Sequence, residues 1–183
     1  MELIVVDPTY DHEGRDPNEF LSALRRELSG VSKTFDCRDV DIGFAADWPA
    51  ILAIFTGLFF LGKPINDNIE AWFSLAKKFK SMLKQIAQKF GHYRIDETGA
   101  TLLGISIIAS QENEDIADIQ QISSNEIQFN NFPLKDPGHL DHHPDNLYVQ
   151  VYLVNKARIY VFGIKSKGTV EFQHTFNTSW LDF

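Results

Sequence analysis

Apolar and polar residues alternate most clearly near the C-terminal end of the chain, over residues 147–154, 158–165 and 169–176. A period of two is typical of strands that bury one face. The residues between these runs, 155–156 and 166–168, include asparagine, serine and glycine, which tight turns favour. The pattern therefore predicts a three-stranded antiparallel meander.

The N-terminal part of the chain opens with a short apolar run, residues 2–6, that predicts a buried strand. Asp16-Pro17 supplies an N-cap and a first-turn proline, so we expect a helix from here to Gly30. Residues 31–44 alternate in two different phases, whereas one continuous strand keeps a single phase. They predict two extended pieces with a break near Arg38-Asp39, the second piece covering residues 39–44.

The middle of the chain is more helical in pattern. Residues 48–62 carry no charge over 15 positions and follow a possible N-cap, Asp47, which favours a buried helix. From residue 68 to 90, apolar residues recur at spacings of three and four, and Gly91 follows at the usual glycine position. Together, residues 48–90 predict a helical hairpin.

A third helix is expected at residues 97–111. Asp96 is a suitable N-cap, and the apolar run that follows is longer than a typical strand. Its isoleucine and threonine content would also suit a strand. Beyond it, residues 112–146 are the most polar part of the chain, with a weak strand at 126–129.

The predicted fold class is α+β: the helical residues 47–111 pack against a mostly antiparallel sheet built from both ends of the chain. The length of 183 residues lies within the usual range for one domain, and no linker divides the sequence. We therefore expect a single domain over residues 1–183.

Composition supports a globular protein with a large core: 44% of residues are hydrophobic, and 15 are phenylalanine. Cys37 is the sole cysteine, so no intramolecular disulfide can form, and a buried, unreactive role fits it best. The N-terminus lacks the basic segment and cleavage pattern of a secretion signal. These features together favour a cytoplasmic location.

The charge distribution indicates the kind of partner. The net charge of −8 argues against free nucleic acid, because phosphate binding needs a basic face. Residues 101–150 hold 8 acidic residues against the single Lys135. Such a region is either a solvated helix end and loop or a surface that attracts a basic protein. The residues predicted to contact a partner are Glu112, Glu114, Asp115, Asp118, Asp141, His142 and Asp145.

Residues 138–145 also have the composition of a metal site. Five possible ligands for a divalent ion lie close together, namely His139, Asp141, His142, His143 and Asp145. The triplet Asp141-His142-His143 resembles the signature of the DHH phosphoesterase family. That resemblance implies two metal ions and hydrolysis of a phosphoester by a metal-activated water.

The resemblance covers only that triplet and Pro144. The family has a further metal-binding set after its first strand, and here Asp7, Asp11 and His12 stand at other spacings. No glycine-rich phosphate loop or nucleophile elbow is present in the sequence. We therefore assign no catalytic residue, no metal and no cofactor.

Three functional hypotheses follow. The favoured one is a non-enzymatic acidic protein that recognises one protein partner, most concretely an immunity protein that neutralises a basic toxin. The second is a metal-dependent hydrolase that uses residues 139–145. The third is a membrane-associated or assembly subunit with residues 48–62 as an apolar contact surface, although 15 residues fall short of the ~20 that a spanning helix needs; we expect no membrane partner.

Overall fold

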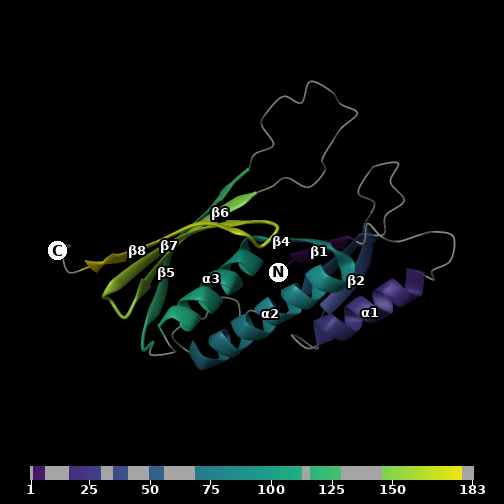
Figure 1. Ribbon diagram of the computed structural model, residues 1–183, viewed down its shortest axis with the longest axis horizontal. Helices are drawn as coiled ribbons and strands as arrows, with labels where there is room; N and C mark the ends of the chain where they lie inside the picture. The colour runs from purple at the N-terminus through teal and green to yellow at the C-terminus, as the bar shows by residue number, and fades with distance from the viewer. Residues whose placement is uncertain are drawn as a thin grey trace, which may run out of the picture.

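The computed structural model describes residues 2–6, 17–29, 35–40, 50–55, 69–112, 116–128 and 146–178. Within these ranges it contains helices and two antiparallel sheets, which confirms the predicted α+β class (Figure 1). The elements in chain order are β1 (Glu2–Val6), α1 (Pro17–Ser29), β2 (Phe35–Val40), β3 (Ala50–Phe55), α2 (Ile69–Phe90), β4 (His92–Ile95), α3 (Glu97–Gln111), β5 (Ile119–Ile127), β6 (Leu147–Val154), β7 (Arg158–Lys165) and β8 (Val170–Asn177).

The N-terminal sheet has the strand order β2-β3-β1-β4, and its neighbouring strands are antiparallel. Leu3 and Val5 of β1 are fully buried, as the apolar run predicted. The predicted break near Arg38-Asp39 is wrong, because β2 pairs with β3 in one unbroken register from Phe35 to Val40.

The helix predicted over residues 48–62 is also wrong where the structure describes it, because Ala50–Phe55 is strand β3. This strand lies between β1 and β2 and hydrogen-bonds to both. A short, continuous apolar run fits a strand that is buried on both faces as well as a buried helix, and periodicity does not distinguish the two. The helix pair of this fold is instead α2 and α3, which pack side by side (Figure 1).

The C-terminal sheet has the order β5-β6-β7-β8, so the predicted meander is confirmed and extended by a fourth strand. Strand β5 begins at Ile119, earlier than the weak strand expected at 126–129. Asn155 and Lys156 connect β6 to β7 with φ angles of 50° and 53°. Two positive φ angles are what a type I′ hairpin turn requires.

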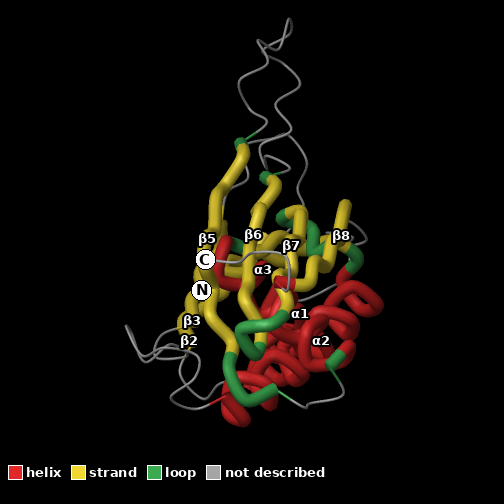
Figure 2. Tube along the Cα trace, turned by 90° about the vertical axis from the view of Figure 1, so that its left-hand side faces the viewer, coloured by secondary structure: helices red, strands yellow, loops and turns green. Residues whose placement is uncertain are grey.

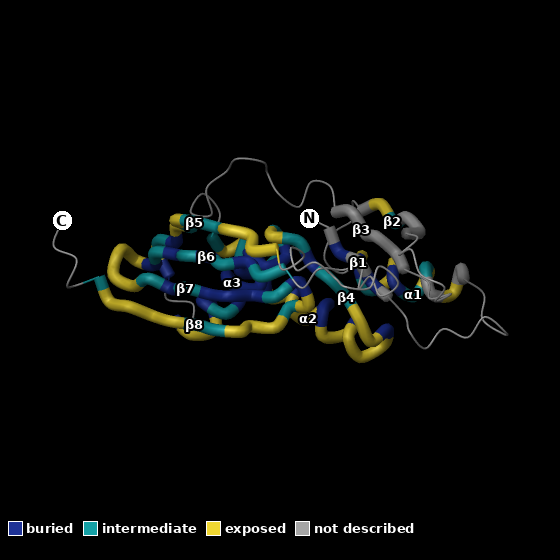
Figure 3. The backbone as a smooth tube through the Cα atoms, turned by 90° about the horizontal axis from the view of Figure 1, so that it is seen from above, coloured by how far each residue is buried: buried dark blue, intermediate teal, exposed yellow. Residues whose placement is uncertain are grey.

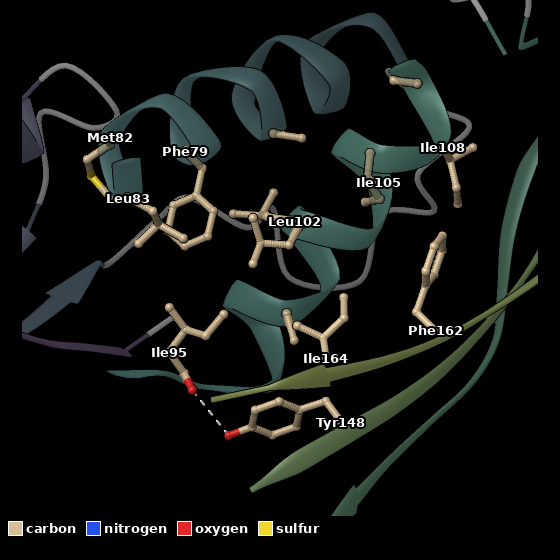
Figure 4. Packing of buried hydrophobic residues seen from close by; sticks show 14 of the residues in the cluster. Phe79, Met82, Leu83, Ile95, Leu102, Ile105, Ile108, Tyr148, Phe162 and Ile164 are labelled. Atoms are coloured by element: carbon tan, nitrogen blue, oxygen red, sulfur yellow. Dashed lines mark hydrogen bonds between the residues drawn. The ribbon is translucent and has the colours of Figure 1, made fainter. Parts of the chain in front are cut away.

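Helix α3 is the central element. Asp96 caps it as predicted, since its Oδ1 accepts a hydrogen bond of 2.8 Å from the backbone nitrogen of Gly99. The helix lies between the C-terminal sheet and α2, so it is buried on nearly all sides (Figures 1 and 2). Figure 4 shows Leu102 of α3 facing Phe79 of α2, with Ile164 of β7 close by. One continuous cluster of buried side chains includes residues from both sheets.

Helices α1 and α2 are amphipathic, as the spacing of apolar residues predicted for residues 68–90. In α2, Phe79 and Ile86 are buried, whereas Lys80 and Lys84 are exposed. Gly91 follows this helix with a φ of 85°, the left-handed conformation that ends many helices. In α1, Leu24 and Leu28 are fully buried.

Candidate functional site

Glu112, the first residue of the predicted acidic surface, is a buried side chain at the end of α3. Its Oε1 accepts a hydrogen bond from the Tyr160 hydroxyl and lies 2.8 Å from the Arg158 Nη1. Burial first, and then the neighbouring Glu112 carboxylate, raise the pKa of Tyr160, so the phenol stays protonated and donates. The expectation that Glu112 is solvated is therefore wrong, because β7 supplies partners that compensate its burial.

Asp118 lies between α3 and β5 and is partly exposed. Its backbone nitrogen donates to the Asn155 side chain at 3.0 Å, and its carbonyl accepts from the Asn155 backbone at 2.8 Å. These bonds fix the start of β5 against the β6–β7 turn. They involve the backbone of Asp118, so the role of its carboxylate in partner binding stays a prediction.

The other predicted contact residues lie outside the described residues, and so does the histidine-rich segment. They are Glu114, Asp115, His139, Asp141, His142, His143 and Asp145. Within the described ranges, no three His, Cys, Asp or Glu side chains gather as a metal site would require. The hydrolase hypothesis therefore remains a prediction.

Two further sequence inferences bear on function. Among the residues that the structure describes, no helix has the length and apolarity needed to cross a membrane. Cys37 in β2 is half-buried, and this burial raises the pKa of its thiol. A raised thiol pKa disfavours the reactive thiolate, which agrees with the structural role expected for this cysteine.

The two faces of the C-terminal sheet lie in different surroundings. Successive side chains of a strand point to opposite faces, so the even-numbered residues of β6 share one face and the odd-numbered residues the other. The even-numbered ones, including Tyr148 and Tyr152, are buried against α3. We call this the inner face, and we call the opposite side the outer face.

The inner face carries a polar chain that is fully bonded. With the Gln150 amide oriented to satisfy both of its ends, its oxygen accepts from the Thr101 hydroxyl at 2.9 Å and its nitrogen donates to the Tyr152 hydroxyl at 2.9 Å. The Tyr152 hydroxyl lies 3.4 Å from the Thr101 carbonyl oxygen, to which it donates. Burial raises the pKa of Tyr152. These groups therefore anchor α3 to the sheet rather than offer an open reactive site.

On β6, β7 and β8 the outer face is mostly apolar, whereas β5 adds the polar residues Gln120, Ser123 and Asn125 along one edge. In the register of the sheet, Val151 pairs with Val161 at its centre, Val149 pairs with Gly163, and Ile159 pairs with Phe176. Paired residues point to the same side, so β6, β7 and β8 together form one surface. Its side-chain members are Leu147, Val149, Val151, Leu153, Ile159, Val161, Lys165, Phe172, His174 and Phe176.

Aromatic rings line this face along β8. The ring centroids of Phe172 and His174 are 6.0 Å apart, and those of His174 and Phe176 are 6.2 Å apart. The Phe172 ring covers Gly163 so closely that a Cβ atom built there would lie 2.2 Å from its Cε1. Phe176 is 43% exposed. Gly163 on β7 thus makes room for the half-buried Phe172 ring, and Phe176 is the more exposed phenylalanine of this face.

The described helices leave the outer face open. The sheet packs on α3 through its inner face, and Figure 3, seen from above, shows β5 to β8 spread over that helix. None of these outer-face residues is acidic. Lys165, which pairs with Leu147 at one end of the face, forms an ion pair of 2.8 Å with Glu171.

Sequence reasoning missed this face, although a signal was present. Strand β6 reads Leu-Tyr-Val-Gln-Val-Tyr-Leu-Val, which is apolar or aromatic at seven of its 8 positions. A strand with one solvated face usually alternates with polar residues. Large side chains at both sets of positions indicate that both faces of the strand are suited to burial.

Comparisons with known proteins return no match to a protein-family model, to a curated protein or to a solved structure. The features that bear on function are therefore those of the molecule itself. Among the described residues, the outer face is an apolar surface on three strands that no described helix covers.

Proposed function

We propose that this chain is a non-enzymatic binding protein that recognises a protein partner through the outer face of its C-terminal sheet. The observation that carries the proposal is the extent of that face, ten residues on three strands with Lys165 and His174 as the polar members. The largest contiguous apolar patch on a soluble monomer is commonly a site of contact with another molecule.

The composition of the face fits the centre of an interface. Interface cores are depleted of charge and enriched in aromatic residues, and here Phe172 and Phe176 stand among aliphatic side chains. The sheet is also a rigid platform, because its inner face is locked to α3 by Phe162, Ile164 and the Gln150 hydrogen bonds. The surface that a partner presents to this face would therefore be apolar.

Site-specific photo-crosslinking in cells tests the proposal. A photoreactive residue at Val161 is expected to give a defined adduct, whereas the same residue at Thr175, exposed on the opposite side of β8, is not. The captured protein is then purified and its affinity measured. Val161→Asp should weaken binding by at least about tenfold, because a carboxylate would have to be desolvated in the contact; Thr175→Asp should change it less than about twofold. Adducts of equal yield at both positions would refute the proposal.

The immunity-protein form of this proposal is supported by the net charge of −8, which attracts a basic toxin. Asp118→Lys is the informative substitution, because Glu112 is engaged in the core and its reversal would disturb the fold. If a basic toxin is the partner, Asp118→Lys should slow association, and added salt should weaken binding. Binding that strengthens with salt would exclude this form.

A further inference from the structure

We infer that the protein partner is a second copy of this chain, with the two C-terminal sheets packed outer face to outer face. This inference rests on the proposed function, and it identifies the partner that binds the outer face. Two sheets that stack in this way form a sandwich with an interlayer distance of about 10 Å. In this arrangement α3 of each copy would lie on the outside of its own sheet.

The chemistry of the face favours a copy of itself. A twofold interface requires a surface that complements itself, so any charge near its axis meets the same charge. The centre of this face is the Val151–Val161 pair, flanked by Val149 and Leu153, and it contains no charge. Aliphatic side chains are complementary to their own kind, whereas a basic toxin would need acidic residues that this face lacks.

The size of the face fits a weak, reversible dimer. Strands β6, β7 and β8 have 8 residues each. With ~4.8 Å between strands and ~3.4 Å per residue, the three strands cover roughly 400 Å² in projection. Two copies therefore bury on the order of 800 Å², less than the ~1,200–2,000 Å² of stable complexes. Such an area predicts a dimer that forms at high protein concentration and dissociates on dilution.

Charge gives this dimer a distinctive response to salt. Each copy carries a net charge of −8, and these charges repel across an interface that itself has no acidic residue. Raising the ionic strength screens this repulsion. Self-association should therefore increase with sodium chloride, which is the opposite of what a basic partner would show.

Sedimentation velocity of the purified chain, over about a hundredfold range of concentration and at low and high salt, tests this inference. We expect a monomer–dimer equilibrium whose dissociation constant falls severalfold at high salt. Val161→Asp and Phe176→Lys should each raise that constant by at least about tenfold, whereas Thr175→Asp should leave it within about twofold. Phe176 is 43% exposed at a sheet edge, so its substitution keeps the test valid if Val161→Asp unfolds. Circular dichroism confirms that each variant is folded.

Two outcomes would overturn the inference. One is a chain that stays monomeric at all concentrations; the other is a dimer that Val161→Asp and Phe176→Lys, both folded, leave intact. A monomeric chain that still forms a Val161-specific adduct with a different protein would exclude the second copy and leave the proposed function standing. If the chain is monomeric and forms no such adduct, both this inference and the proposed function are refuted.

Discussion

Buried tyrosine hydroxyls hold the inner face of the C-terminal sheet to its surroundings. The Tyr148 hydroxyl donates to the Ile95 carbonyl at 3.2 Å, as Figure 4 shows, and the Tyr160 hydroxyl donates to Glu112. A buried phenol ionises reluctantly, since the phenolate would lose its hydration. Burial accordingly raises the pKa of Tyr148 to about 12.

This pKa predicts a loss of stability in alkali. An unfolded tyrosine ionises near pH ~10, and Tyr148 ionises near 12 in the folded chain. Because the folded pKa is the higher, the stabilising contribution is complete below pH ~10 and is lost as pH rises toward 12. Urea unfolding from pH 8.5 to 11.5 should show a steeper loss for the native chain than for Tyr148→Phe. Parallel curves for the two proteins would contradict the assignment.

A single glycine determines how closely α3 approaches β4. A Cβ atom on Gly99 would lie 2.7 Å from the Cβ of Ile95, an atom attached directly to the backbone and unable to swing away. Gly99→Ala should therefore lower the free energy of unfolding by ~1–3 kcal/mol, although alanine favours a helix by ~1 kcal/mol. The control is Ser110→Ala at an exposed position of the same helix, expected to change stability by less than about 0.5 kcal/mol. A stabilised Gly99→Ala protein would show that the approach is looser than described.

At the scale of elements, local signals predicted helices better than they predicted sheet membership. Asp96, Gly91 and the spacing of Phe79 and Ile86 place α2 and α3 correctly, because caps and amphipathic periodicity are local properties. The strand Ala50–Phe55 was predicted as a helix, since only its pairing with β1 and β2, far away in sequence, makes it a strand.

The candidate site was harder to predict for the same reason. Glu112 belongs to an acidic run in the sequence, yet Arg158 and Tyr160 from a distant strand bury it. The outer face depends on the register of three strands, in particular on the pairing of Val151 with Val161 and of Gly163 with Phe172. A single strand does not reveal which of its two faces the helix covers.

The N-terminal cap of α3 provides a test at this scale. The Asp96 carboxylate accepts from the Gly99 backbone nitrogen at 2.8 Å, and α3 touches both sheets and α2. Asp96→Ala should cost ~1 kcal/mol in chemical denaturation, and Asp96→Asn, which retains an acceptor, should cost much less. Equal losses for the two variants would indicate that the negative charge, and not the hydrogen bond, supports the helix.

At the scale of the whole molecule, α3 organises the fold asymmetrically. It lies against the inner face of the C-terminal sheet and against α2, and one continuous core results (Figures 1 and 4). This asymmetry leaves the outer face with strongly apolar side chains and without a described helix above it. Both proposals depend on that face being open to solvent in the monomer.

The solvent exposure of the outer face in the monomer is measured most directly by the relaxation that a soluble paramagnetic agent causes in methyl groups. The experiment uses methyl-labelled protein at a concentration where sedimentation shows the monomer, and compares Val151 and Val161 of the outer face with Val154, which is 1% exposed on the inner face. We expect strong relaxation of the Val151 and Val161 methyls and little relaxation of the Val154 methyls, with protection of the first two in the dimer. If Val151 and Val161 are as protected as Val154 in the monomer, another part of the chain covers the face, and it is not the contact surface proposed here.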